Sequence, residues 1–205
     1  DAFRQMLDSG VGGDTFGDSI WVAEQFNVAD LSDLGDARLV YEAATSIDNK
    51  PWVYQAARAL EELLDPSDAL YMDVLQTRIE EEEAQYDYPA VSKLARKMLA
   101  LGDDSAQSLL EKSLSEGGES AELLTILHTR LAKNDGEPKV LLTRIARIYE
   151  KSERWRDVCD TLDEFSVEDR DEHWANLAWP AGEQTRRADL QAAAAALKSE
   201  LVRAP

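Results

Sequence analysis

Apolar residues recur every three or four positions through most of the chain, a spacing that places them on one face of an α-helix. The pattern begins near residue 36 and runs to residue 201, interrupted by short polar turns. Asn49-Lys50-Pro51 is one such turn, because Asn can cap exposed helix amides and proline fits the first helical turn. A short helix through Trp174 is expected to stop near Pro180-Ala181-Gly182. Val, Ile and Thr never cluster in alternation, so we predict an all-α chain without strands.

The predicted helices alternate at a nearly constant spacing. Candidate first helices begin near residues 36, 68, 104, 137 and 171, and candidate second helices begin near 51, 89, 120, 155 and 184. Successive starts lie about 33–34 residues apart on average, which is typical of helix–turn–helix repeats. HEAT and armadillo units need roughly 40–47 residues, and leucine-rich repeats contain a strand. The alternative is an ordinary helical bundle whose helices have similar lengths.

One segment, residues 148–158, carries the features of a known repeat at the level of single residues. Tyr149 ends the first helix, Trp155 opens the second, and the small apolar Val158 follows three positions later. Leu162 then supplies a large apolar side chain. This segment resembles a tetratricopeptide (TPR) repeat, in which Tyr149 would pack in the angle between the two helices and Val158 would let their backbones approach. The Trp-Leu-Gly pattern that opens the family's first helix is absent from every unit.

The resemblance implies both a fold and a class of function. It implies an α-solenoid of about five TPR-like helix pairs over residues 36–205, closed by an Ala-rich C-terminal capping helix. Residues 1–35 are expected to form an N-terminal arm of irregular helical structure, in which Gly10–Thr15 is a flexible linker. TPR pairs stack into a superhelix whose concave side binds peptides or partner helices. We therefore expect a non-catalytic scaffold, adaptor or assembly subunit, with an acidic TPR-type secretion chaperone as the alternative within this class.

The charge balance narrows the range of partners. The chain has 41 Asp and Glu against 22 Lys and Arg, a formal net charge of −19. Such a field repels DNA, RNA and anionic lipid, and no quarter of the chain is basic. No apolar run approaches the roughly 20 residues that a membrane helix needs. We expect the partner to be another protein or peptide, with neither nucleic acid nor a membrane bound directly; the oligomeric state stays open.

The start of the chain bears on the compartment. No basic segment followed by an apolar core opens the sequence, so no signal peptide is visible and a cytoplasmic location is favoured. The chain begins at Asp1 rather than Met, as a processed product or a fragment would, and a targeting segment could therefore have been removed. The sequence thus leaves the compartment undecided.

Four residues of one predicted helix are candidates for partner binding. If Tyr149 marks the register of that helix, Thr143, Arg144, Arg147 and Lys151 lie on or near the concave surface. A ladder of basic side chains in an acidic protein could hold an acidic segment or a C-terminal carboxylate. The alternative is a solvated basic face that balances neighbouring acids.

The run Glu80–Glu83 is the longest run of like charge in the chain. Four adjacent carboxylates point around all sides of a helix and repel one another, which predicts an exposed, solvated helix end or turn. The alternating Asp and Asn with a central Gly that define a calcium loop are missing.

The sequence gives catalysis little support. The two histidines, His128 and His173, lie 45 residues apart and form neither a His-x-x-x-His nor a His-Glu-x-x-His motif. His128 is expected to be packed or half-exposed. The single cysteine, Cys159, falls in the apolar stripe of its helix and excludes an internal disulfide and a cysteine-based zinc site. We expect no cofactor, no metal and no catalytic residue; the alternative class is a helical enzyme with an unrecognised site.

Overall fold

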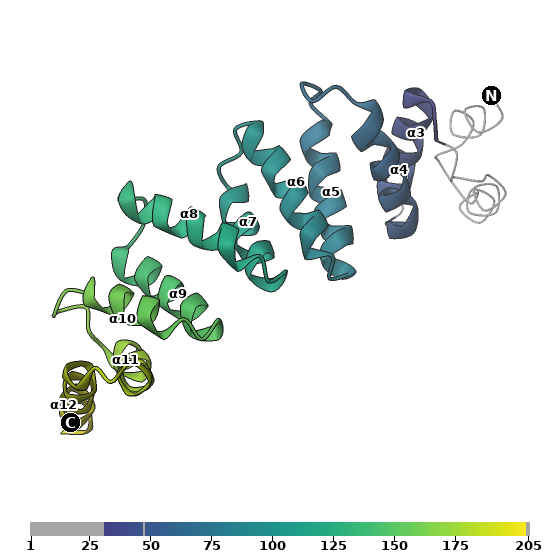
Figure 1. Ribbon diagram of the computed structural model, residues 1–205. Coiled ribbons are helices and arrows are strands. Elements are labelled where there is room, and N and C mark those ends of the chain that lie inside the picture. The colour runs from purple at the N-terminus through teal and green to yellow at the C-terminus, as the bar shows by residue number, and fades with distance from the viewer. Residues whose placement is uncertain (1–30, 47, 204–205) are drawn as a thin grey trace. The chain divides into compact units, whose positions relative to one another are not determined.

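The computed structural model describes residues 31–46 and 48–203. Within these ranges the chain forms ten α-helices and no strand, which confirms the all-α prediction (Figure 1). In chain order the helices are α3 (Leu34–Ser46), α4 (Lys50–Leu63), α5 (Tyr71–Ala84), α6 (Tyr88–Ala100), α7 (Ala106–Glu116), α8 (Ser120–Ala132), α9 (Pro138–Lys151), α10 (Trp155–Asp163), α11 (Glu172–Thr185) and α12 (Ala188–Arg203). The predicted arm 1–35, with its Gly10–Thr15 linker, lies almost entirely outside the described residues.

The chain divides into two compact units, and the division falls between Ser113 and Leu114. In the first unit α3 packs against α4, α4 against α5, and α5 against α6. In the second unit each of α8, α9, α10 and α11 packs against the helix that follows it, and α11 also contacts α9. Helices that are neighbours in sequence are therefore neighbours in space within each unit. Across the described ranges, every helix is too short or too polar to cross a membrane.

The helix starts reproduce the predicted spacing. First helices begin at residues 34, 71, 106, 138 and 172, and second helices begin at 50, 88, 120, 155 and 188, so successive starts differ by 32 to 38 residues. Capping explains why several boundaries were predictable. The side chain of Asp87 accepts a hydrogen bond from the Ala90 amide at 3.1 Å, and proline occupies the first turn of α6. This regular spacing is compatible with a helical repeat fold.

Four of the first helices turn the same set of positions, i, i+3, i+4 and i+7, toward the core; all of these residues are buried except Arg78 and Tyr149, which are half-buried. These positions are Ala37, Val40, Tyr41 and Ala44 in α3; Tyr71, Val74, Leu75 and Arg78 in α5; Leu142, Ile145, Ala146 and Tyr149 in α9; and Trp174, Leu177, Ala178 and Ala181 in α11. Only Arg78 among them is charged. Its position is that of Tyr149 in α9, so a guanidinium occupies a place where the other helices have apolar or aromatic side chains.

Arg78 changes the environment of the glutamate run, and the prediction that Glu80–Glu83 is solvated is wrong for its two central residues. Glu81 and Glu82 are only 5% and 8% exposed. Arg78 donates to both carboxylates, and Arg58 of α4 also donates to Glu81. Because each buried carboxylate is paired and hydrogen-bonded, the cost of removing it from water is offset.

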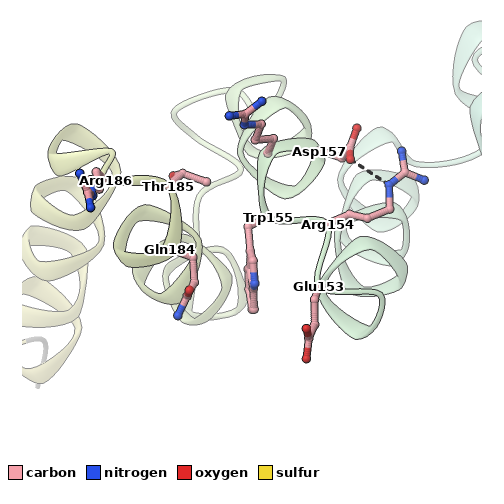
Figure 2. A pocket seen from close by; sticks show the side chains of 8 residues that line it. Glu153, Arg154, Trp155, Asp157, Gln184, Thr185 and Arg186 are labelled. Atoms are coloured by element: carbon pink, nitrogen blue, oxygen red, sulfur yellow. Dashed lines mark hydrogen bonds and ion pairs between the residues drawn. The ribbon is translucent and has the colours of Figure 1, made fainter.

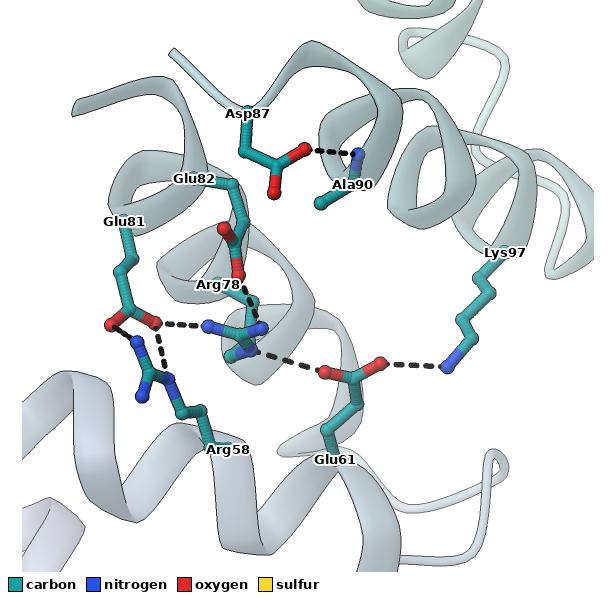
Figure 3. A network of polar contacts seen from close by, with 8 residues as sticks. All are labelled: Arg58, Glu61, Arg78, Glu81, Glu82, Asp87, Ala90 and Lys97. Atoms are coloured by element: carbon teal, nitrogen blue, oxygen red, sulfur yellow. Dashed lines mark hydrogen bonds and ion pairs between the residues drawn. The ribbon is translucent and has the colours of Figure 1, made fainter. Parts of the chain in front are cut away.

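The same network continues to Glu61 of α4 and Lys97 of α6 (Figure 3). Arg78 Nε lies 3.1 Å from Glu61 Oε2, and Lys97 Nζ lies 2.7 Å from Glu61 Oε1. Burial disfavours the charge of Glu61, but the hydrogen bonds from Lys97 and Arg78 outweigh it and hold the pKa of Glu61 below its ordinary value of 4.5. One cluster of ion pairs thus connects α4, α5 and α6.

In the second unit, α11 differs from its prediction because it does not stop at Pro180-Ala181-Gly182 and continues to Thr185. Gly182 serves a different purpose from ending the helix. A Cβ atom there would lie 2.8 Å from the backbone oxygen of Arg187 and 2.9 Å from Gln191 Cγ. Gly182 therefore allows α11 to approach the start of α12 closely, and the proline removes only one helical donor.

Trp174 is the largest side chain in the core of the second unit. It is 2% exposed, and its indole Nε1 donates to the backbone oxygen of Leu162 at 3.2 Å. The Asp171 side chain caps the start of α11 by accepting from the Trp174 amide at 3.0 Å. Asp171 also forms an ion pair with Lys139 of α9 at 2.9 Å. The same side chain therefore caps α11 and connects it to α9.

Candidate functional site

The four predicted partner-binding residues lie on α9, but most of their polar groups have partners within the chain. Arg147 donates to Glu150 Oε2 at 3.0 Å, one turn further along the helix. The Thr143 hydroxyl donates to the backbone oxygen of Lys139 at 2.8 Å. Arg144 is half-buried and also engaged, whereas Lys151 is exposed in the last turn. The four do not form a ladder of unpaired cations.

A groove of about 590 Å³ runs between α8 and the end of α9 in the second unit. Its lining residues are Ala121, Leu124, Thr125, His128, Thr129, Ala132, Tyr149 and Arg154. Six of them follow one face of α8 at spacings of three or four residues, and four of these six are small. The groove is therefore shallow along α8 and bounded by larger side chains from α9 and the turn after it.

The larger side chains of this groove contact one another. The Arg154 guanidinium lies 4.5 Å from the centre of the Tyr149 ring, a cation–π contact. The Tyr149 hydroxyl lies 3.2 Å from His128 Nε2, and Arg154 Nε donates to Asp157 Oδ2 at 2.9 Å. His128 is exposed, and Tyr149 packs against the buried cluster that contains Val158, as its register predicts. This end of the groove is polar and aromatic, and its side chains are held by contacts with one another and with Asp157.

A second hollow, a notch of about 460 Å³, lies where the α9–α10 turn faces the end of α11. We call it the Trp155 notch; its lining residues are Glu153, Arg154, Trp155, Arg156, Asp157, Gln184, Thr185 and Arg186. Figure 2 shows the Trp155 indole between the side chains of Glu153 and Gln184, with all three pointing to the same side. The notch combines an aromatic surface with charged and amide groups.

Two residues of the notch have left-handed backbone. Glu153 follows α9 with φ of 55°, and Arg186 follows α11 with φ of 61°. Gly102 and Gly118 occupy such positions after α6 and α7, with φ of 89° and 75°. A non-glycine residue in this conformation costs roughly 1–2 kcal/mol, and Asp48, Tyr86 and Asn134 adopt it elsewhere in the chain as well.

The groups considered for catalysis lie apart. Cys159 is buried as predicted, and its Sγ lies 3.3 Å from the Thr185 hydroxyl. His173 is exposed on α11, and His128 contacts Tyr149. In the part of the chain that the structure describes, no three His, Cys, Asp or Glu side chains gather in an arrangement that could hold a metal ion.

The comparisons with known proteins give no match. No protein-family model, no curated protein and no solved structure matches this chain. Its class is therefore defined by its own geometry: the described residues are all-helical, and within each unit neighbouring helices pack against one another, which is compatible with a helical repeat.

Proposed function

We propose that the protein is a non-catalytic interaction scaffold, and that the groove between α8 and α9 holds a peptide or helix of a partner protein. The observation that carries the proposal is the groove itself, with Ala121, Thr125, Thr129 and Ala132 along α8 and with Tyr149 at one end. Small side chains let a partner backbone approach closely, because the distance between packed helices depends on the side chains at the contact. The amphipathic helix-in-groove mode is one that partner proteins commonly use.

The polar end of the groove would fix the direction of the bound segment. Tyr149 and Arg154 are held by mutual contact, so a partner group that meets them does not have to immobilise them. His128 Nε2 and the Tyr149 hydroxyl offer hydrogen-bonding atoms beside the apolar floor. Such an aromatic and arginine pair is the composition that dominates binding energy in interfaces.

We also propose that the helix pairs are TPR-like units. The 32–38-residue spacing of the helix starts supports this, and so does a pattern that sequence inspection missed in α11. Trp174, Leu177 and Ala178 have the spacing of the family's Trp-Leu-Gly pattern, with alanine in place of glycine, and all three are buried. The family uses its paired helices for protein binding, which agrees with the proposed scaffold.

The proposal assigns the partner to the groove rather than to the predicted residues of α9. Arg147 already pairs with Glu150, and the Thr143 hydroxyl is used within the helix. A partner that bound there would first have to replace these internal contacts. Along α8 the groove also offers the apolar side chains of Ala121, Leu124 and Ala132, which have no hydrogen bond to exchange.

A matched pair of substitutions tests the proposal. Thr125 lies in the groove and Thr45 on α3; both are exposed, and each hydroxyl donates to the backbone oxygen four residues earlier. Thr125→Trp would fill the groove, whereas Thr45→Trp makes the same chemical change in the other unit. With a purified partner, calorimetric titration should show affinity reduced about tenfold or more by Thr125→Trp, since hot-spot positions cost at least about 2 kcal/mol. Equal affinity for the two variants would remove the groove from the proposal.

A further inference from the structure

The Trp155 notch is unusual because it contains two exposed arginines that form no ion pair within the described part of the chain. Acids outnumber bases by 41 to 22, so most arginines find a carboxylate. Ion pairs with a carboxylate are formed by Arg38, Arg58, Arg78, Arg130, Arg147, Arg154 and Arg187, and other arginines of the described residues, such as Arg96 and Arg144, are engaged as well. Arg156 and Arg186 are exposed and pair with no carboxylate of the described chain, and both line the same notch.

The remaining charges of the notch compensate these two cations only in part. Arg154 and Asp157 neutralise each other through their ion pair. Glu153 is the only other acid in the lining, so the notch as a whole is cationic in a chain of net charge −19. At physiological ionic strength, charges separated by more than about 8 Å are largely screened, so a short ligand responds to the notch more than to the whole protein.

We propose that the Trp155 notch binds a short acidic peptide segment of a partner protein, with carboxylates on Arg156 and Arg186 and an apolar side chain on the Trp155 indole. Arginine presents a fork of donors that matches carboxylate geometry. The Gln184 amide, on the other side of the indole from Glu153, supplies further donors (Figure 2). A long polyanion is a poor alternative because it would extend into the negative field of the rest of the chain.

The left-handed backbone at Arg186 makes glycine a clean substitution for testing its charge. Glycine would satisfy the same turn after α11 without strain, as it does after α6 and α7. The inference rests on the proposed protein-binding function only in that its ligand is a peptide, and the notch shares only Arg154 with the groove.

The test uses a fluorescein-labelled peptide, Glu-Asp-Glu-Phe-Asp-Glu, and a counterpart with lysine at every acidic position. The protein should bind the acidic peptide more tightly than the basic one in fluorescence polarisation. Arg186→Gly should weaken binding of the acidic peptide about two- to fivefold, the range for a single exposed ion pair, while the melting temperature stays the same or rises. Tyr86→Gly is the matched control, because Tyr86 is exposed and has φ of 58° after α5, and its peptide affinity should be unchanged.

Glu153 decides between the two signs of ligand charge. If the ligand is acidic, Glu153→Gln removes a repulsive charge and should strengthen binding about twofold. A weaker complex with Glu153→Gln, or tighter binding of the lysine peptide, would overturn the proposal. Equal affinity of the wild type and Arg186→Gly for the acidic peptide would do the same.

Nuclear magnetic resonance locates the bound peptide. The indole N–H signal of Trp155, assigned by its loss in Trp155→Phe, should shift during titration with the acidic peptide. An unmoved signal at saturation would contradict the assignment. Thr125→Trp should leave this titration unchanged, so the notch and the groove can fail independently.

Discussion

Replacing Arg78 by methionine removes the centre of the ion-pair cluster in the first unit and keeps a side chain of comparable length. Arg78 is 12% exposed and contacts three carboxylates. Glu61 would keep Lys97 as a partner, but Glu82 would lose the only ion pair that it makes within the described residues. Breaking a buried pair costs about 3–5 kcal/mol, and because two of the carboxylates retain a base we expect about 3 kcal/mol. For a chain of this size that corresponds to a melting temperature lower by about 6–12 °C.

The control for this experiment is Lys112→Met. Lys112 pairs with Glu83 at 2.8 Å, but its side chain is 61% exposed and that of Glu83 is 34% exposed. Exposed pairs contribute about 0–1 kcal/mol, so this variant should melt within about 4 °C of the wild type. The two variants differ in burial rather than in the kind of charge that is removed.

The effect of Arg78→Met should also depend on pH. The pKa of Glu61 lies below 4.5 in the folded protein, so the stability that its charge contributes is present above pH 4.5 and is lost as the pH falls through that lower pKa. Without Arg78, the folded-state pKa of Glu61 should rise, and protonation of Glu61 at low pH would relieve part of the lost pairing. The difference from the wild type should therefore be largest near pH 7 and smaller at pH 4, measured by circular dichroism. A penalty that equals that of Lys112→Met, or that is the same at both pH values, would refute the reasoning.

Three further substitutions test other parts of the structure. Gly182→Ala should destabilise the protein by about 1–2 kcal/mol in thermal unfolding, although alanine is the better helix former, because its Cβ would meet the Arg187 backbone oxygen; a stabilised variant would contradict that contact. Trp174→Ala should cost about 3–5 kcal/mol in denaturant unfolding, and a loss under 1 kcal/mol would show that the indole is not part of the core. Reversing the charges of Arg147 and Lys151 to glutamate should change partner affinity by no more than about twofold, measured by calorimetry, whereas abolished binding would place the partner on α9.

Local signals explain how much of the fold was predictable. The start of α6 depends on Asp87 and on proline in the first turn, and both act within a few residues. The second-helix starts at 88, 120 and 155 fall within one residue of their predicted values, although α8 and α10 have neither a side-chain cap nor a proline in the first turn. The end of α11 was not predictable from local signals. Gly182 is required by its close contact with Gln191 of the next helix, and it does not end its own helix.

The burial of Glu81 and Glu82 was not predictable, because it depends on contacts between helices. Glu81 and Glu82 lie in a run that reads as solvated, and the arginine that neutralises Glu81 from α4 lies 23 residues earlier. The available signal was Arg78 itself, which occupies a position that α9 fills with Tyr149. A cation at a core position requires acids nearby, and periodicity alone does not reveal which helix supplies them.

The candidate site was predictable only in part. The sequence indicated the helix that carries Tyr149, but it favoured the basic residues of α9 over the adjacent α8. The signal for the groove was the series of small residues on α8, Ala121, Thr125 and Ala132, on the side away from Leu123 and Leu127. The internal partners of Arg147 could not be read from the sequence, because any nearby acid could have met solvent instead.

Site-specific crosslinking tests the central claim most directly. Thr129 lies in the groove and is exposed, and its hydroxyl donates to the backbone oxygen four residues earlier, as that of Thr45 does on α3. A photoreactive benzoylphenylalanine at position 129 should form one stoichiometric crosslink to a partner protein, and the same group at position 45 should form none. Crosslinking from position 45 to the same extent, or none from position 129 while the partner is bound, would contradict the account.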